Sequence, residues 1–434
     1  MASKEIGRSY FPSEDLPPVL KGEEGFCRTG SSFGAYFNIV CVVAGSGTLG
    51  IPYAFRLGGW VSVIFLVLSA VMSIYTGQLL MECIYSKPGE RLLSYPEIGE
   101  AAFGNVGKHM VQFLHYITLL GVTCMYLVLI GKNMKEACEI IQFSGIGIRE
   151  WVAIGGAAII IPLILLRTLK EVAWLSLLGA LATLYVVIIT VVVSLKDIPR
   201  QLAMRGAPLN SSWKVINWSD LPSSLATISF SFGGNIIYPH VECSMRHPKQ
   251  WTKVLAAAMA TIAAMYGLIG IVAYYVYGDT VQSPIMMSLP KENEALSAMI
   301  IITVHIVLVL PITLCSFSLE AESKLGLGAS SFNALTKFGI RSGIRIGTLA
   351  VLTVIAAFLP HFPELMSLIG AFSNCAVVFV IPIVCHLKLF GYKNRSFLEY
   401  VWILLVLAVA SMGCFIGTVW AVRGLQDAVQ KGSS

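Results

Sequence analysis

Charged side chains are scarce in this sequence. Asp, Glu, Lys and Arg make up 12% of its 434 residues, against roughly 25% in an ordinary soluble domain. Hydrophobic residues make up 56%, and the mean hydropathy is +0.76. These values predict a polytopic α-helical protein that lies in a lipid bilayer. The net charge of +6 gives no reason to expect a nucleic-acid partner.

Several functional signatures are also missing. The ten cysteines form no Cys-x-x-Cys pair and have no Cys/His spacing typical of zinc. We therefore expect no metal and no cofactor. The apolar segments hold no paired acids and no Ser/His dyad, so we do not expect an enzyme. Residues 1–28 are polar and contain Pro17-Pro18, which predicts a disordered cytosolic tail instead of a signal peptide.

Eleven apolar segments approach the length of about 20 residues that a spanning helix needs. None of them contains an Asp, Glu, Lys or Arg. The fourth and ninth are short, and we expect the helices there to extend into their flanks. The segments are 29–55, 57–81, 109–131, 151–166, 172–195, 221–241, 254–278, 295–319, 346–360, 365–385 and 401–422.

The loop charges predict the orientation. If the N-terminus is cytosolic, 19 of the 30 Lys and Arg residues fall on the inner side, as the positive-inside rule requires. The odd number of spans then places the C-terminus in the lumen or outside the cell. The sequons at Asn210 and Asn217 fall on that outer side and would make a glycoprotein, whereas the sequon at Asn394 falls inside.

One inner loop has a helical pattern of its own. Ser94 can cap a helix, Pro96 suits its first turn, and Gly104 suits its end. We expect a short amphipathic helix on the cytosolic face there.

The first apolar segment contains a glycine-rich motif, Gly45-x-Gly47-x-x-Gly50, followed by Pro52. It is not a dinucleotide fingerprint, because it lies within an apolar run and has Ser73 where the ribose-binding acid is required. It is not a P-loop either, because the Lys and Ser/Thr are missing. Glycines and a proline interrupt helical hydrogen bonding, and free backbone groups at membrane depth are tolerated where they line a cavity. The motif thus predicts a discontinuous spanning helix at a transporter's binding site.

The sixth segment repeats this arrangement. Gly234 precedes Pro239 by five residues, as Gly47 precedes Pro52. Interrupted segments at matching places in two halves are typical of inverted-repeat transporters. The predicted organisation is a tail (1–28), a first five-helix repeat (29–195), an outer loop (196–220), a second repeat (221–389), and an eleventh helix with the C-terminal tail (390–434).

These two segments resemble those of a known family. The run from Gly45 to Ala54 is similar to the first-helix signature of the amino acid/auxin permease family, which includes vacuolar-type amino acid transporters. Phe232-Gly233-Gly234, with Glu242 three residues after Pro239, resembles that family's sixth helix and the following loop. The resemblance covers residues 29–422. It implies a LeuT-type fold of 5+5 helices plus one, with helices 1 and 6 discontinuous, and secondary active transport of amino acids by alternating access.

The two interruptions suit an amino acid zwitterion. Amides at the start of the second half of the first helix can bind the carboxylate, while freed carbonyls and polar side chains accept from the ammonium. Gly45, Gly47, Gly233 and Gly234 leave the backbone bare, so that the ligand can approach it. Because the apolar segments contain no charged side chain, neutral amino acids are the expected substrates. The expected substrate-binding residues are Gly45, Ser46, Gly47, Thr48, Leu49, Ser231, Phe232, Gly233, Gly234, Asn235 and, on the third helix, Tyr126.

The coupling ion is expected to be H⁺, with Na⁺ the alternative. Sodium-coupled relatives carry an Asn where this chain has Cys41, and a thiol is a poor ligand for a hard cation. Hydroxyls of the eighth segment could still serve sodium: Thr313, Ser316 and Ser318. The expected proton-coupling groups are Glu242 and, next, His305; an ion pair of Glu242 with Arg246 at i+4 is the competing reading.

Other functions remain open. An amino acid sensor of the same fold and a sodium-coupled symporter are the alternatives. The expected partners are a small amino acid and the lipid bilayer. The expected location is a vacuolar or lysosomal membrane, with the plasma membrane as the alternative. The sequence leaves protein partners open.

Overall fold

The computed structural model describes residues 28, 30–45, 47–87, 89–143, 145–165, 172–324, 333–391 and 395–433. Apart from an isolated bridge between Gly30 and Met245, these residues form helices and connecting loops. The helices of the first half are α1 (Ser32–Val43), α2 (Gly47–Gly58), α3 (Ser62–Ile84), α4 (Tyr95–Ile140), α5 (Ile148–Leu165), α6 (Val172–Lys196) and α7 (Ile198–Arg205).

The second half contains α8 (Leu221–Ser231), α9 (Tyr238–Ser244), α10 (Trp251–Tyr277), α11 (Asn293–Lys324), α12 (Ala334–Phe358), α13 (Phe362–Ile369), α14 (Ile381–Phe390) and α15 (Phe397–Ser433). Between α13 and α14 the chain is π-helical over Gly370–Asn374 and Ala376–Val380. The all-α class predicted from the sequence is confirmed.

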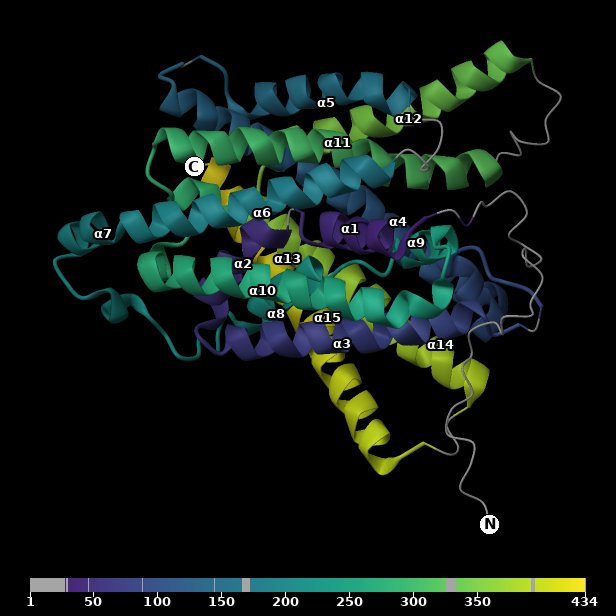
Figure 1. The fold of residues 1–434 in the computed structure, drawn as a ribbon. Coiled ribbons are helices and arrows are strands. Elements are labelled where there is room, and N and C mark those ends of the chain that lie inside the picture. Colours follow the sequence, from purple (N-terminus) through teal and green to yellow (C-terminus); the bar gives the residue numbers. More distant parts are fainter. Residues whose placement is uncertain are drawn as a thin grey trace.

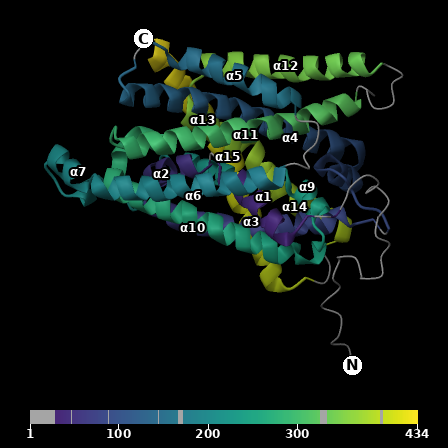
Figure 2. The ribbon, with the colours of Figure 1, turned by 45° about the horizontal axis from the view of Figure 1, so that its top comes forward.

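The helices form one bundle in which most axes run in similar directions (Figure 1). In both ribbon views α5 and α12 lie on one side of the bundle and α3 and α10 on the other (Figures 1 and 2). α1 packs against α6 and α10, α2 packs against α8 and α10, and α11 packs against α4 and α6. The short helices α1, α2, α8 and α9 are therefore surrounded by longer ones.

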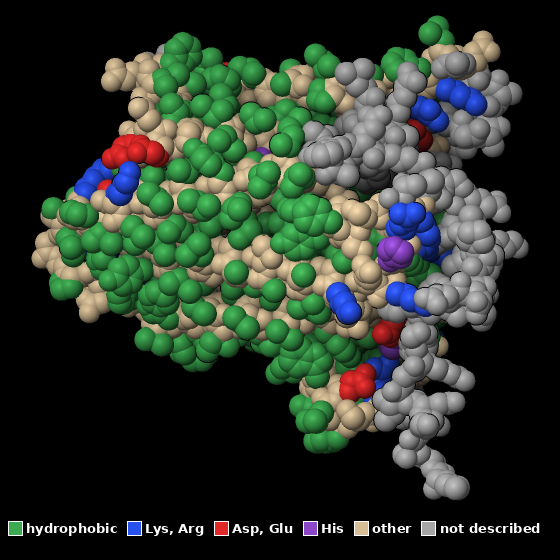
Figure 3. Space-filling view, viewed as in Figure 1, with side chains coloured by type: hydrophobic (Ala, Val, Ile, Leu, Met, Phe, Trp, Pro, Cys, Tyr) green, Lys and Arg blue, Asp and Glu red, His purple; other side chains and the backbone are tan. Residues whose placement is uncertain are grey.

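The surface suits a bilayer. Figure 3 shows a broad band of apolar and uncharged side chains, with acidic and basic side chains gathered towards the two ends of the bundle. Apolar side chains such as Leu404 (66% exposed) and Val351 (60% exposed) face outwards. Lipid is the solvent that makes such exposure favourable. The protein is an integral membrane protein.

Eight helices of the described chain are long and apolar enough to cross a membrane, or nine if the bent pair α1 and α2 counts as one span. α5 and the short helices α8 and α9 are not among them. A count of eleven spans thus stays an expectation. The expected extension of the two short apolar segments into their flanks is confirmed. α5 begins before residue 151, and α12 begins before residue 346.

Local boundaries follow sequence signals. α4 begins at Tyr95, directly after Ser94, and has a proline in its first turn. Gly104 interrupts it with a φ of 66°, a conformation that favours glycine. The expected short helix before Gly104 is therefore present as the first arm of α4. The outer loop, by contrast, contains α7 and the 3₁₀ turn Leu209–Ser212, which we did not predict.

Candidate functional site

The first helix is interrupted where the glycine motif predicts it. α1 ends at Val43, α2 begins at Gly47, and their axes differ by 50°. The first amides of α2 have no partner within their own helix. Pro52 lies inside α2 and cannot donate to the carbonyl four residues earlier. Ser46 lies outside the described residues.

The sixth segment is divided between two helices. α8 ends at Ser231, and α9 begins at Tyr238 with Pro239 in its first turn. The chain between them turns tightly, because the amide of Gly233 donates to the carbonyl of Phe230 (3.0 Å). α1 and α2, like α8 and α9, are separate helices in the described chain, and that each pair forms one discontinuous span stays an expectation.

The two interruptions lie next to each other. The hydroxyl of Tyr266, on α10, lies 2.7 Å from the carbonyl of Val43 and 2.7 Å from that of Ser231. Its single proton donates to one of them at a time. The hydroxyl of Ser231 lies 3.4 Å from the carbonyl oxygen of Gly47. One buried phenol therefore joins the end of α1 to the end of α8.

The glycines allow close packing of protein groups. A Cβ on Gly47 would lie 2.7 Å from the Tyr266 hydroxyl and 3.0 Å from Cα of Ser231. On Gly234 it would lie 2.6 Å from the ring of Tyr238. We interpreted these glycines as space for the ligand. The structure corrects this, because protein side chains occupy the space that a Cβ would need.

Gly45 has a different environment. A Cβ there would lie 3.5 Å from both Nε2 of His305 and the hydroxyl of Tyr126, which is an ordinary contact distance. Both side chains are buried, His305 on α11 and Tyr126 on α4. The structure thus brings Tyr126 and His305 to the first interruption, although they are about 80 and 260 positions further along the chain.

The polar groups of the site are partly engaged. The hydroxyl of Thr48, in the first turn of α2, donates across the interruption to the carbonyl of Ala44, the residue after α1. The hydroxyl of Ser231 donates to the carbonyl of Thr227 (2.9 Å), and its oxygen can still accept a hydrogen bond. Asn235 is fully buried and donates to the carbonyl of Val378 (2.9 Å), and its Oδ1 finds no hydrogen-bond partner among the described residues. Leu49 and Phe232 are fully buried.

Glu242 lies in a buried ionic cluster. One of its oxygens accepts from Nη2 of Arg91 (2.7 Å), and the other accepts from the hydroxyl of Tyr85 (2.5 Å). Arg28 lies 3.8 Å away. Burial is the largest single influence and lowers the pKa of Arg91, but the neighbouring acidic groups, Glu242 first among them, together outweigh it, so that this pKa is raised. We refer to Arg28, Tyr85, Arg91 and Glu242 as the inner cluster.

Arg246 is not the main partner of the Glu242 carboxylate, so the i+4 ion pair considered from the sequence is wrong. The i+4 rule assumes that the helix continues, but α9 ends at Ser244 and Met245 is extended. The amide of Arg246 instead donates to the carbonyl of Gly30 (2.7 Å). The chain before α1 is therefore paired with the chain after α9, next to the inner cluster.

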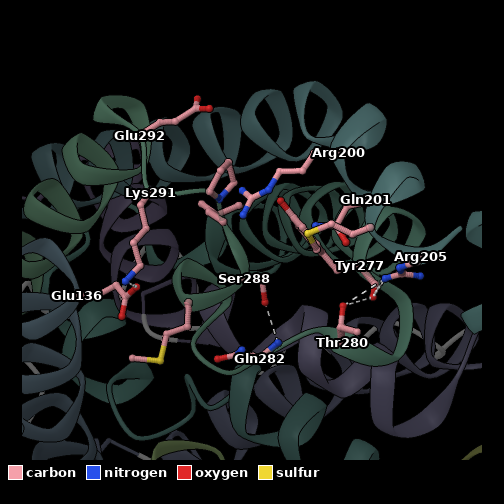
Figure 4. Close-up of a pocket in the computed structure, with 14 residues that line it drawn as sticks. Glu136, Arg200, Gln201, Arg205, Tyr277, Thr280, Gln282, Ser288, Lys291 and Glu292 are labelled. Carbon is pink, nitrogen blue, oxygen red and sulfur yellow. Dashed lines mark hydrogen bonds and ion pairs between the residues drawn. The ribbon is translucent and has the colours of Figure 1, made fainter. Parts of the chain in front are cut away.

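A cavity of about 700 Å³ lies away from these residues, between the end of α4, α7, the end of α10 and the segment before α11 (Figure 4). No residue that we expected at the substrate site lines it. Two of its basic groups have partners: Lys291 binds Glu139 (2.6 Å), and Arg205 donates to the carbonyl of Tyr277 (2.5 Å). Among the described residues, no group of His, Cys, Asp and Glu could hold a metal ion.

Sequence reasoning missed several residues of this region. Tyr266 lies near the centre of an apolar segment, where tyrosine is usually a packing residue, and Arg91 lies in a loop. No local pattern connects them to the interruptions. The only signal for Arg91 was the family-like Glu242, which as a buried acid requires a partner.

Comparisons with known proteins agree with this geometry. Residues 28–423 match the family model described as "Transmembrane amino acid transporter protein". The chain is 28% identical to amino acid transporter AVT1B of Arabidopsis thaliana, covering 95% of this chain and 75% of that one. It is 27% identical to AVT1I of the same plant (96% and 99% covered). It is 25% identical to the vesicular inhibitory amino acid transporter of Xenopus tropicalis (97% and 84% covered).

Solved structures support the fold. MhsT in complex with L-phenylalanine aligns with a TM-score of 0.57 at 13% identity, over 92% of this chain and all of that one. A Na⁺-coupled sialic acid symporter aligns with a TM-score of 0.55 at 15% identity, over 91% and 90% of the two chains. Both are LeuT-fold transporters. The relatives are named as transporters and not as enzymes. This chain belongs to the transmembrane amino acid transporter family.

Proposed function

We propose that this protein is a secondary active transporter of neutral amino acids, driven by protons, with its substrate site between α1/α2 and α8/α9. The observation that carries this proposal is the adjacency of the two interruptions, which Tyr266 joins through the carbonyls of Val43 and Ser231. Two helix interruptions at one place offer free amides and free carbonyls together. A zwitterion needs both.

The substrate class follows from charge. The amides of Gly47, Thr48 and Leu49 open α2, where the helix dipole favours a carboxylate. The free Oδ1 of Asn235 and the oxygen of Ser231 can accept from an ammonium. The α1, α2 and α8 helices contain one charged side chain, Arg56 in the last turn of α2. A charged substrate side chain would have no counter-ion at the site, which favours neutral amino acids.

Protons are the proposed coupling ion. Cys41 and His305 both lie close to Gly179: a Cβ there would be 2.5 Å from the Cys41 sulfur and 2.6 Å from Nδ1 of His305. A thiol beside an imidazole is a poor sodium site and a suitable place for a proton. The hydroxyls of Thr313 and Ser318 donate to carbonyls of their own helix, and the side chain of Ser316 lies outside the described residues. These contacts favour H⁺ over Na⁺.

Glu242 remains the first candidate for the coupling group, and His305 the second. Glu242 ties α9 to the loop after α3 through Arg91. If this end of the protein opens, α9 must separate from that loop, and the freed carboxylate then meets water and protons. We propose that this end faces the cytosol, that Ser433 lies on the other side, and that the membrane is vacuolar or lysosomal, with the plasma membrane as the alternative. A relative named for vesicles supports an internal membrane.

Ligand-induced stabilisation tests the zwitterion site. We expect the melting temperature of the purified protein to rise with one or more neutral amino acids. Analogues that lack the carboxylate or the ammonium should have no effect, because each loses one half of the contacts. A ligand at about 100 times its Kd stabilises the folded state by roughly 2.7 kcal/mol, which a thermal scan resolves. Equal stabilisation by the amine or acid analogues would contradict the proposed site.

A further inference from the structure

The segment between α13 and α14 is unusual within this bundle. Gly370–Asn374 and Ala376–Val380 are π-helical, with Cys375 between them. π-helical turns are rare and are frequently found at functional sites. Both stretches pack against α15, and the first also packs against α8. This places a widened helix beside the second interruption.

Two asparagines connect the π-helical stretches to that interruption. Nδ2 of Asn374 donates to the carbonyls of Ser229 (2.9 Å) and Phe230 (3.2 Å), in the last turn of α8. The same carbonyls accept from the backbone amides of Phe232 (3.2 Å) and Gly233 (3.0 Å), three residues further on, because α8 ends there. In the opposite direction, Nδ2 of Asn235 donates to the carbonyl of Val378 (2.9 Å). Each side therefore donates one side-chain amide to backbone carbonyls of the other.

The contact is tightly packed. Asn374 is 1% exposed. A Cβ on Gly233 would lie 2.5 Å from its Nδ2 and 2.8 Å from its Oδ1. The amide group is the end of its side chain, but two hydrogen bonds hold it in place. The place that a Cβ at position 233 would need is therefore occupied by the side chain of Asn374, and glycine avoids this clash.

We propose that Asn374 is a positioning residue of the substrate site. It holds the open end of α8, and through it the backbone of 232–235, in the conformation that presents carbonyl and amide groups to the amino acid. It also fixes the second interruption to the π-helical stretches, so that the two move together. Nothing in the sequence pattern assigns a role to Asn374. The inference rests on the proposed transport function.

The first test is Asn374→Ala, compared with Asn133→Ala in uptake by reconstituted vesicles. Asn133 is a matched control: it is also 1% exposed, donates once, to Thr303 (3.2 Å), and has an Oδ1 without a hydrogen-bond partner among the described residues. Loss of two hydrogen bonds at the site should raise KM about tenfold. We expect kcat and the melting temperature without ligand to change no more than in Asn133→Ala.

The second test covers the case in which Asn374→Ala folds poorly. Gly233→Ala should abolish uptake, because its Cβ meets the amide of Asn374. Adding Asn374→Ala removes that amide and should restore measurable uptake, with a KM similar to that of Asn374→Ala alone. Such rescue shows that the two positions are energetically coupled.

The outcomes separate this inference from the proposed function. If the wild type transports amino acids but Asn374→Ala matches Asn133→Ala in KM, the positioning role is wrong and transport stands. If the double variant is no better than Gly233→Ala, the coupling is wrong as well. A wild type that transports no amino acid would overturn the proposed function itself.

Discussion

Gly47→Val is expected to abolish amino acid binding and uptake while the protein still inserts into the membrane. Even a single Cβ at this position would lie 2.7 Å from the Tyr266 hydroxyl and 3.0 Å from the backbone of Ser231. Valine adds two further methyl groups with little rotational freedom. The side chain must therefore push α8 and α10 away from α2, which separates the two halves of the site. Thermal shift with substrate and vesicle uptake measure the loss.

Gly347→Val is the matched control for this substitution. Gly347 also lies within a helix, α12, but a Cβ there has no heavy atom within 4 Å. We expect uptake near the wild-type level from this control. Wild-type substrate affinity in a correctly inserted Gly47→Val protein would remove the first interruption from the site.

Glu242→Gln is expected to eliminate accumulation driven by a pH gradient, while exchange of amino acids across the membrane persists. Glutamine cannot bind and release a proton, so the transport cycle loses its link to the gradient. It keeps the shape of glutamate: its one carbonyl oxygen can still accept from Arg91, and its NH2 group can donate to the hydroxyl oxygen of Tyr85. The substitution leaves Arg91 without its counter-charge, and removing one partner of a buried pair can cost about 3–5 kcal/mol. Exchange is therefore measured together with the melting temperature.

Glu322→Gln separates proton coupling from lost stability. Glu322 is also buried and pairs with Arg345 (3.3 Å) and Arg341 (3.2 Å), between α11 and α12. Its replacement should lower stability by a similar amount but leave pH-driven accumulation intact. If Glu242→Gln still concentrates amino acid in response to a pH gradient, the coupling role passes to His305, whose Nε2 lies near Gly45.

The sequence alone predicted the parts of the fold that local patterns encode. Gly45 to Pro52 and Gly234 to Pro239 marked the two interruptions, because glycine and proline act on the backbone where they stand. Ser94, Pro96 and Gly104 marked the first arm of α4 for the same reason. Apolar runs without charge indicated every long helix of the described chain.

Contacts between distant segments could not be predicted in the same way. Tyr266 is 223 positions from Val43, Asn374 is 145 from Ser229, and Arg91 is 151 from Glu242. Each of these side chains acts on a backbone carbonyl or carboxylate that only the folded bundle brings near. The π-helical stretches were missed because they have no clear sequence signature. α7 was missed because it is only eight residues long, although Gly206 ends it with a φ of 60°.

The interpretation of the glycines shows the same limit. Their small size was correctly linked to close approach, but the approaching group was taken to be the ligand. Gly47 lies against Ser231 and Tyr266. Gly233 lies against Asn374, and Gly234 lies against Tyr238. Sequence indicates that a position needs space on its Cβ side, whereas only the structure shows what fills it.

Uptake of radiolabelled amino acids by vesicles containing the purified protein is the most direct test of the account. A gradient of two pH units supplies roughly 2.7 kcal/mol per proton, enough for about hundredfold accumulation. We expect at least one neutral amino acid to accumulate when a pH gradient is imposed, with or without Na⁺, and to leak out when a proton ionophore is added. Binding without uptake would instead make the protein a sensor, and accumulation that follows Na⁺ and ignores pH would contradict proton coupling.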